Sequence, residues 1–241
     1  MRGNMNATLV DIPYRLSIRF ATNGFSVYVY DVNDKIVATI NLAYQHSGDT
    51  DSLREAVLSL KPSLPDCQSI TLICETGFYT LVPKSFFVSE HALDFLKLQH
   101  PDVPETDQVF SHSFQNHDSV FIFAYDAGIM QTFTDIFPSL KIEHQLIPFV
   151  EQAERQDIIS IFIREESMDC LLCHQGIIKL LNHYPYQTAE DIVYHVLNIA
   201  HHLQYDITEF EIAVYGDEAN TKDHEEVIRT YLPQTDFRTI Q

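Results

Sequence analysis

The stretch CLLCH, from Cys170 to His174, has the spacing that most directly suggests chemistry. Two cysteines three residues apart with a histidine after them match the string for covalent haem attachment, and they also offer zinc ligands. The stretch lies in an expected β-strand, however, where residues three apart point to opposite faces of the sheet. The two thiols could not then meet at one ligand, so the pattern favours two small core or half-exposed thiols.

The twelve histidines of the chain include one pair that could share a metal ion. His195 and His202 lie on one face of an expected helix, but a rise of about 1.5 Å per residue separates them by about 10 Å along the axis. The place of His202 at the end of that helix is explained more simply by the negative end of the helix dipole. We therefore predict no metal site.

Nucleophilic catalysis has no readable residues in this chain. No serine lies in a G-x-S-x-G turn, and no cysteine has a histidine at a recognisable spacing. The acidic pairs Glu165–Glu166 and Asp217–Glu218 could serve as acid and base if a cleft gathered them. Adjacent carboxylates more often form a solvated turn, so we predict no catalytic residue.

Glycine is scarce in this sequence. The chain has seven glycines, and no two of them are adjacent or separated by a single residue; average usage is roughly 7%. Loops that cradle phosphates need backbone N–H groups converging on the ligand with no Cβ in the way, which is why glycines cluster in them. The sequence has no G-x-G-x-x-G and no P-loop string, so it contains no recognisable phosphate loop.

The charge of the chain limits its partners. Of the 241 residues, 34 are Asp or Glu and 15 are Lys or Arg, which gives a formal net charge of −19. Such a chain repels phosphate backbones and anionic headgroups, so nucleic acid and anionic membrane surfaces are excluded as expected partners. We find no apolar run long enough to span a membrane and no secretion signal, and we expect a cytoplasmic protein whose four cysteines are thiols.

The first part of the chain reads as three antiparallel strands, a helix and a strand. The strands at 14–20, 24–31 and 35–44 are joined by turns rich in Asn, Asp and Gly, which tolerate positive φ. Ser52 and Glu55 form a capping-box pattern that predicts the start of a helix with Leu53, Ala56, Val57 and Leu60 on one face. A buried strand follows at 69–75.

The same order recurs later in the chain. Strands are predicted at 158–163, 168–174 and 177–184, then a helix capped by Thr188, and a strand at 210–217. We interpret the recurrence as an internal duplication of structure.

The remaining segments complete each half. After the first unit we predict a helix at 89–99, strands at 109–115 and 119–125, and a helix at 127–137; after the second, a helix at 221–232 and a strand at 236–240. Each half then has the order βββαβαβ, a mixed sheet with helices on its faces. The fold class is therefore α/β, with one subdomain expected at 1–147 and a second at 148–241.

The doubled βββαβαβ order resembles the actin-like ATPase superfamily, which includes sugar kinases, Hsp70 chaperones, filament proteins of the MreB and FtsA kind, and the pilus protein PilM. It also resembles a bacterial domain-of-unknown-function family described as having an actin-like ATPase fold. The resemblance spans nearly the whole chain and implies two ribonuclease-H-like subdomains. In that superfamily two phosphate-binding hairpins and an adenosine-binding turn hold ATP in the cleft between the subdomains.

The second hairpin departs from the superfamily pattern. Ser160 stands where an Asp would position hydrated Mg²⁺, and bulky residues ending at Arg164 stand where glycines belong. Glu165 takes the place of a threonine and would repel a phosphate.

The first hairpin and the adenosine turn depart in the same way. Ser17 takes the Asp position, Arg19 lies in the glycine region, and Gly216 is followed by Asp217 where a second glycine is expected. We therefore expect no cofactor at these degenerate cleft positions, which are Ser17, Arg19, Ser160, Arg164, Glu165, Gly216 and Asp217.

The fold resemblance and the missing motifs together indicate a protein-interaction module, a degenerate actin-like ATPase without catalytic activity. Its expected partner is another protein, and a second copy of the chain is one form that this partner could take. The alternative is a divergent nucleotide-binding enzyme, an ATPase or phosphotransferase that uses the cleft in an altered way.

Overall fold

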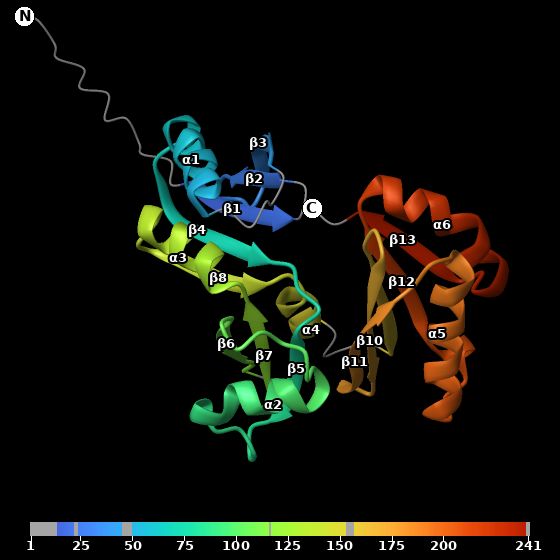
Figure 1. The fold of residues 1–241 in the computed structure, drawn as a ribbon. Helices are drawn as coiled ribbons and strands as arrows, with labels where there is room; N and C mark the ends of the chain where they lie inside the picture. Colours follow the sequence, from blue (N-terminus) through green and yellow to red (C-terminus); the bar gives the residue numbers. More distant parts are fainter. Residues whose placement is uncertain (1–13, 22–23, 45–49, 116, 153–156, 240–241) are drawn as a thin grey trace, which may run out of the picture. The chain divides into compact units, whose positions relative to one another are not determined.

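The computed structural model describes residues 14–21, 24–44, 50–115, 117–152 and 157–239 (Figure 1). These residues form two five-stranded sheets and one three-stranded sheet, with helices packed against them. Among the residues that the structure describes, no helix is both long and apolar enough to cross a membrane.

The N-terminal sheet has five strands in the order β3-β2-β1-β4-β8. Alternate residues of β1 (Leu16, Ile18 and Phe20) are buried, and Phe20 meets Phe133 of the helix α3 with ring centroids 6.1 Å apart. The period of two in this strand therefore gives the sheet one face that binds helices. The strands are β1 (Tyr14–Ala21), β2 (Gly24–Tyr30), β3 (Ile36–Ala43), β4 (Cys67–Cys74) and β8 (Leu140–His144), and the helices are α1 (Thr50–Leu60) and α3 (Ala127–Ile136).

The start of α1 differs from the sequence prediction. The helix begins at Thr50, so Ser52 is the third helical residue and not the N-cap. The Ser52 hydroxyl lies 3.4 Å from the Tyr44 hydroxyl instead. The predicted apolar face is confirmed at Leu53 and Val57, which are fully buried. A 3-10 turn, η1 (Lys61–Ser63), follows the helix.

The C-terminal sheet repeats the arrangement, with strands in the order β11-β10-β9-β12-β13. The predicted order βββαβαβ is therefore confirmed for both five-stranded sheets. The strands are β9 (Ile158–Ile163), β10 (Ser167–His174), β11 (Ile177–Pro185), β12 (Glu211–Gly216) and β13 (Thr235–Thr239); the helices are α5 (Ala189–His202) and α6 (Glu218–Tyr231), with a 3-10 turn η4 (Ile207–Glu209).

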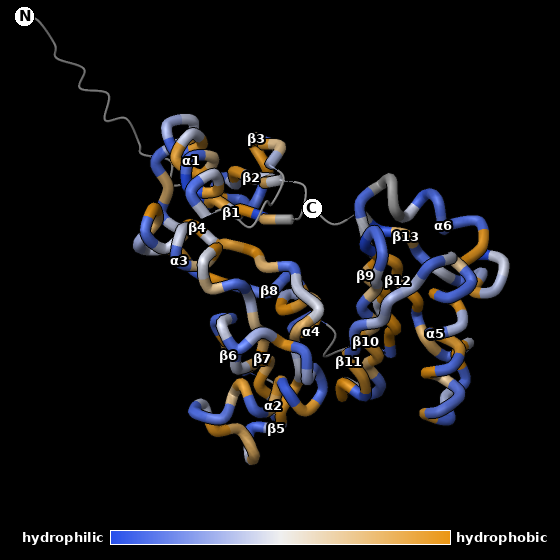
Figure 2. The backbone as a smooth tube through the Cα atoms, in the orientation of Figure 1, coloured by the Kyte–Doolittle hydropathy of each residue, from blue (hydrophilic) through white to orange (hydrophobic). Residues whose placement is uncertain are grey.

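The helix α5 begins and packs as its sequence predicts. Thr188 and Asp191 form a capping box, in which each side chain accepts a hydrogen bond from the backbone of the other residue. Ile192, Val196 and Ile199 are buried in the core between α5 and the sheet. Figure 2 shows hydrophobic and hydrophilic residues alternating along α5, as expected of a helix with one buried face.

The three-stranded sheet was not predicted. The strand near 119–125 pairs in it with β5 on one side and with the strand near 109–115 on the other, and neither joins the five-stranded sheets. The predicted helix at 89–99 is divided into a 3-10 turn and α2. We refer to these elements as the small sheet with its helix. They are β5 (Tyr79–Pro83), β6 (Gln108–Ser113), β7 (Ser119–Tyr125), η2 (Ser89–His91) and α2 (Ala92–Gln99).

The chain forms two compact units, each built from segments that are not contiguous in the sequence. The first comprises 1–76, 104–108 and 125–145, and so holds the N-terminal sheet with α1 and α3. The second comprises the rest of the chain: the small sheet, the helix α4 (Ile147–Gln152) and the C-terminal sheet. The division into subdomains at 1–147 and 148–241 stays a prediction.

We expect Ile161→Ala to lower the free energy of unfolding by about 2–5 kcal/mol, because Ile161 is fully buried on the central strand β9. The matched change Ile177→Ala removes the same atoms from a side chain that is 56% exposed and should cost less than about 1 kcal/mol. Urea unfolding followed by far-ultraviolet circular dichroism measures both, since the chain has no tryptophan. Equal losses would contradict the assigned core.

Candidate functional site

Ser160 lies in the middle of the C-terminal sheet. It is 4% exposed, and its neighbours across the strands are Leu171 of β10 and Ala213 of β12. The residue at the position of the superfamily Asp is therefore a buried hydroxyl among apolar neighbours, with no carboxylate to hold Mg²⁺.

Aromatic rings fill the same face of the sheet one step further along. Phe162 stacks on Tyr215 of β12 with ring centroids 5.0 Å apart, and Phe149 of α4 meets both rings at 4.6 and 4.9 Å. Phe162 is 1% exposed. The position where the superfamily has glycine is therefore occupied by a packed aromatic ring.

The turn between β9 and β10 uses its backbone groups internally. The N–H of Arg164 donates to the carbonyl oxygen of Ser167 at 2.8 Å, and the N–H of Tyr186 donates to that of Glu166 at 3.2 Å. The Tyr186 hydroxyl donates to the carbonyl oxygen of Arg164. Glu165 and Glu166 are exposed at the tip, so the turn presents carboxylates where a phosphate would need donors.

The side chain of Arg164 folds back onto a buried carboxylate, Asp169 of β10. Asp169 is fully buried, and its Oδ2 pairs with the Arg164 guanidinium. Its Oδ1 accepts hydrogen bonds from the Tyr79 hydroxyl of β5 and from Nδ1 of His183 of β11, both at 2.8 Å. We call these four residues the Asp169 cluster. Because Tyr79 belongs to β5, the cluster joins the small sheet to the C-terminal sheet.

Burial and the charges of the cluster shift the pKa values of Asp169, Tyr79 and the neighbouring Cys170. Burial alone would raise the pKa of Asp169, but the hydrogen bond from His183 and the charge of Arg164 outweigh burial and lower that pKa below its ordinary value. Burial and the Asp169 charge raise the pKa of Tyr79 well above its ordinary value. Burial, with a smaller contribution from Asp169, raises the pKa of the Cys170 thiol to about 12. At neutral pH the carboxylate is ionised while the phenol and the thiol are protonated, which favours a structural role over a nucleophile.

Two further contacts bring the small sheet against β11. The amide of Gln99 donates to the side-chain oxygen of Asn182 at 2.7 Å. The backbone of Gly77 passes so close to the His183 ring that a Cβ there would lie 2.8 Å from it. A side chain at position 77 would therefore have to displace the His183 ring from its place in the Asp169 cluster.

Gly216 and Asp217 lie at the end of β12, next to the β9–β10 hairpin. A Cβ on Gly216 would stand 3.0 Å from the carbonyl oxygen of Ile163 and 2.8 Å from Cγ2 of Thr221. The Asp217 carbonyl oxygen accepts the N–H of Thr221 at 3.0 Å in the first turn of α6. The glycine that matches the adenosine turn therefore has a local packing reason to be there.

Ser17 and Arg19 lie in the other compact unit, on β1. Both are half-buried and share the sheet face opposite the one that binds α1 and α3. Ser17 is flanked by Tyr28 of β2 and Thr71 of β4. The tip of this hairpin, 22–23, lies outside the described residues. In the second compact unit, the β9–β10 hairpin and the end of β12 hold the remaining sequence-predicted positions: Ser160, Arg164, Glu165, Gly216 and Asp217.

The cysteines and histidines considered as haem or metal ligands are buried or contact other groups of the protein. Cys170 and Cys173 are both fully buried. His195 stacks on Tyr184 with centroids 4.7 Å apart, and Nδ1 of His202 donates to the carbonyl oxygen of Asn198 at 2.9 Å. Within the described ranges, no three or more His, Cys, Asp or Glu side chains gather as metal ligands would.

The sequence reading did not identify Asp169, His183 or Tyr79. One signal was available, because Asp169 interrupts an otherwise apolar strand and a buried carboxylate must be paired. Its partners were not readable, since Tyr79 lies 90 residues away in the chain.

The chain belongs to the DUF3822 family, described as a protein of unknown function, whose family model matches residues 6–235. No curated protein matches the sequence.

Several solved structures are similar to this one. A protein of unknown function with an actin-like ATPase fold from Bacteroides thetaiotaomicron has a TM-score of 0.73 and 17% identity, over 95% of this chain and 94% of that chain. The PilM–PilN type IV pilus biogenesis complex matches with a TM-score of 0.52 and 8% identity, over 94% and 88%. The ethanolamine utilization protein EutJ from Carboxydothermus hydrogenoformans matches with a TM-score of 0.50 and 12% identity, over 94% and 84%. The fold is therefore that of the actin-like ATPases, and the predicted resemblance is confirmed.

We expect Asp169→Asn to lower the free energy of unfolding by about 3–5 kcal/mol, because it removes the charge that offsets a largely buried Arg164. Asp34→Asn is the matched control: it removes the carboxylate of an exposed pair with Arg15 and should change stability by less than about 0.5 kcal/mol. Urea unfolding of both variants measures the difference. A mild effect of Asp169→Asn, equal to that of the control, would contradict the cluster.

The contribution of Asp169 should disappear in acid. Its pKa is lower in the folded than in the unfolded chain, so its stabilisation is complete above an unfolded pKa of about 3.9 and is lost as the pH falls through the folded value. The gap in unfolding free energy between the parent protein and Asp169→Asn should therefore stay constant above about pH 5 and shrink as the pH falls below about 4. Urea titrations above and below these pH values test this, and a gap that does not shrink in acid would refute it.

Proposed function

We propose that this DUF3822 protein acts by binding another protein and is a degenerate actin-like ATPase that does not bind or hydrolyse ATP. The observation that carries the proposal is the filled β9–β10 hairpin. Phe162 packs against both Phe149 and Tyr215, and Arg164 is held against Asp169, where an actin-like ATPase would need open backbone donors.

Asp169 does not supply the Mg²⁺ ligand that Ser160 lacks. It is fully buried, and its two oxygens already meet Tyr79, His183 and Arg164. Mg²⁺ keeps most of its water shell when bound to nucleotide and needs carboxylates that water can reach. The metal that ATP chemistry requires therefore has no supporting carboxylate at Ser160, the position of the superfamily Asp, or at Asp169.

Charge works against a triphosphate at the same place. Glu165 and Glu166 are exposed at the tip of the hairpin, and the chain as a whole carries a formal charge of −19. A bound nucleotide would add further negative charge beside them, while the neighbouring Arg164 is already paired with Asp169 and the turn has no glycine-rich backbone.

A fold that has lost its nucleotide chemistry still offers rigid surfaces for other proteins. PilM, which has a similar fold, is solved in a type IV pilus biogenesis complex with PilN. That precedent supports a protein partner here. We place this activity in the cytoplasm, because the four cysteines are thiols and suit a reducing compartment.

Thermal unfolding with Mg-ATP and Mg-ADP tests the proposal. A ligand at 100 times its Kd adds about 2.7 kcal/mol of stability, which raises Tm by several degrees at about 2–4 °C per kcal/mol. We expect no shift with either nucleotide, while an ATP-binding actin-like protein run in parallel shifts.

A double variant, Glu165→Thr with Glu166→Thr, serves as a control for charge. It restores the threonines of the superfamily pattern but leaves Phe162 and the Arg164–Asp169 pair in place, so we expect no shift for it either. A saturable rise in Tm for the parent protein would favour the divergent nucleotide-binding enzyme instead.

A further inference from the structure

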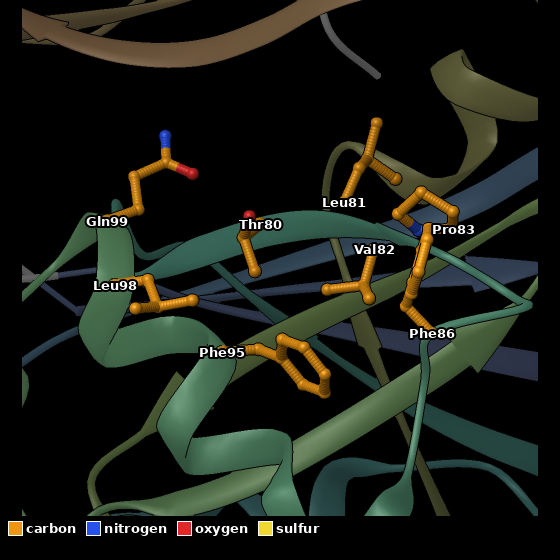
Figure 3. A pocket seen from close by; sticks show the side chains of 8 residues that line it. All are labelled: Thr80, Leu81, Val82, Pro83, Phe86, Phe95, Leu98 and Gln99. Carbon is orange, nitrogen blue, oxygen red and sulfur yellow. The ribbon is translucent and has the colours of Figure 1, made fainter.

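The small sheet carries an apolar groove between its strand β5 and its helix α2. The hollow has a volume of about 440 Å³ and is lined by side chains of both elements and by Phe86. Figure 3 shows Leu98 at one end and Phe86 at the other, with Phe95 and Val82 between them. We call this hollow the β5–α2 groove.

The ends of the groove are unusually exposed for apolar side chains. Leu98 is 84% exposed and Phe86 is 70% exposed. Single exposed apolar residues are common, but two at the ends of one apolar hollow form a continuous surface of the kind that binds other molecules.

The strand β5 beside the groove is the edge strand of the small sheet, and its register with β7 shows which backbone N–H and C=O groups point outward. The order of the small sheet is β5-β7-β6. The N–H of Lys84 donates to Asp118 and the carbonyl of Phe78 accepts from Ala124, so the even-numbered residues of β5 face β7. The N–H and C=O of Leu81 therefore point away from β7, towards the free edge.

Both ends of that edge are already capped. The carbonyl oxygen of Tyr79 lies 2.9 Å from Nε2 of His100. Pro83 has no N–H, and its carbonyl oxygen accepts from Phe86 and Phe87. An incoming strand would therefore pair with Leu81 alone, which fixes its register and restricts it to a short segment.

The same register determines which side chains of the added strand enter the groove. In an added strand, the residues before and after the one opposite Leu81 lie on the side of Thr80 and Val82, which faces α2. These two side chains must be apolar to meet Phe95 and Leu98. The segment thus carries an apolar-x-apolar pattern.

The charges around the groove favour a basic segment. Asp94, one helical turn from Leu98, is 74% exposed with its Oδ2 2.9 Å from Nδ1 of His91, and Asp102 is exposed just beyond the end of α2. Lys97, next to Leu98, is half-buried. The ammonium of Lys84 is turned to the carbonyl oxygen of Phe114 at 2.6 Å. A second copy of the chain would bring another formal charge of −19 to this surface, so like-charge repulsion disfavours it.

We propose that the β5–α2 groove binds a short extended segment of a partner protein, with an apolar-x-apolar pattern flanked by Lys or Arg, which adds to the edge of β5 at Leu81. This inference rests on the proposed function and names the surface and the chemistry of the partner.

Selection of random peptides displayed on phage against the whole chain tests the proposal. We expect enriched peptides to share an apolar-x-apolar pattern with basic flanks. They should lose about tenfold or more in affinity for Leu98→Asp and bind Ile177→Asp unchanged; that control puts the same charge on a side chain that is 56% exposed on β11. Circular dichroism checks that both variants fold, and hydrogen exchange of the Leu81 amide should slow when an enriched peptide is bound.

Each other result overturns the proposal. Failure to enrich peptides on the parent protein over Leu98→Asp would mean that the groove is not a peptide site. Enrichment of acidic peptides would contradict the partner's charge. Sedimentation showing a dimer that Leu98→Asp dissociates would assign the groove to a second copy. A failed peptide selection would not change the result of thermal unfolding with nucleotides. A Tm shift with a nucleotide would refute the proposed function but would leave the peptide result standing.

Discussion

The buried charge of Asp169 is the constraint on which the described C-terminal unit depends. An ionised carboxylate without solvent access costs several kcal/mol unless donors surround it. Its donors come from three separate places: Arg164 in the hairpin turn, His183 on β11 and Tyr79 on β5. The loss of any one of these donors would leave the buried Asp169 charge incompletely compensated. The same interaction therefore closes the β9–β10 hairpin and fixes the small sheet against the C-terminal sheet.

The residues that hold the actin-like fold differ from those that fill the β9–β10 hairpin. The strand order and the helices depend on apolar residues such as Ile161 and Ile192, which have no part in ATP binding. The hairpin tip depends on local side chains, and here these are Phe162 and Arg164 instead of glycines. Fold and site are thus determined by different residues, and one can change while the other stays.

The sequence predicted the large elements well for physical reasons. The strands at 158–163 and 168–174 are long apolar runs, and Thr188 and Asp191 cap α5 locally, so both are readable from neighbouring residues. Two strands of the small sheet were predicted, but its edge strand β5 was missed because it has only five residues and ends in a proline. The Asp169 cluster was missed because its partners are brought together by tertiary folding, which no local pattern encodes.

The most direct measurement is a crystal structure of the protein grown with Mg²⁺ and a non-hydrolysable ATP analogue. We predict that Arg164 remains paired with Asp169, that Phe162 remains packed against Phe149 and Tyr215, and that no nucleotide lies against the β9–β10 hairpin. Density for a triphosphate at that hairpin, with Arg164 turned from Asp169 towards the phosphates, would contradict it.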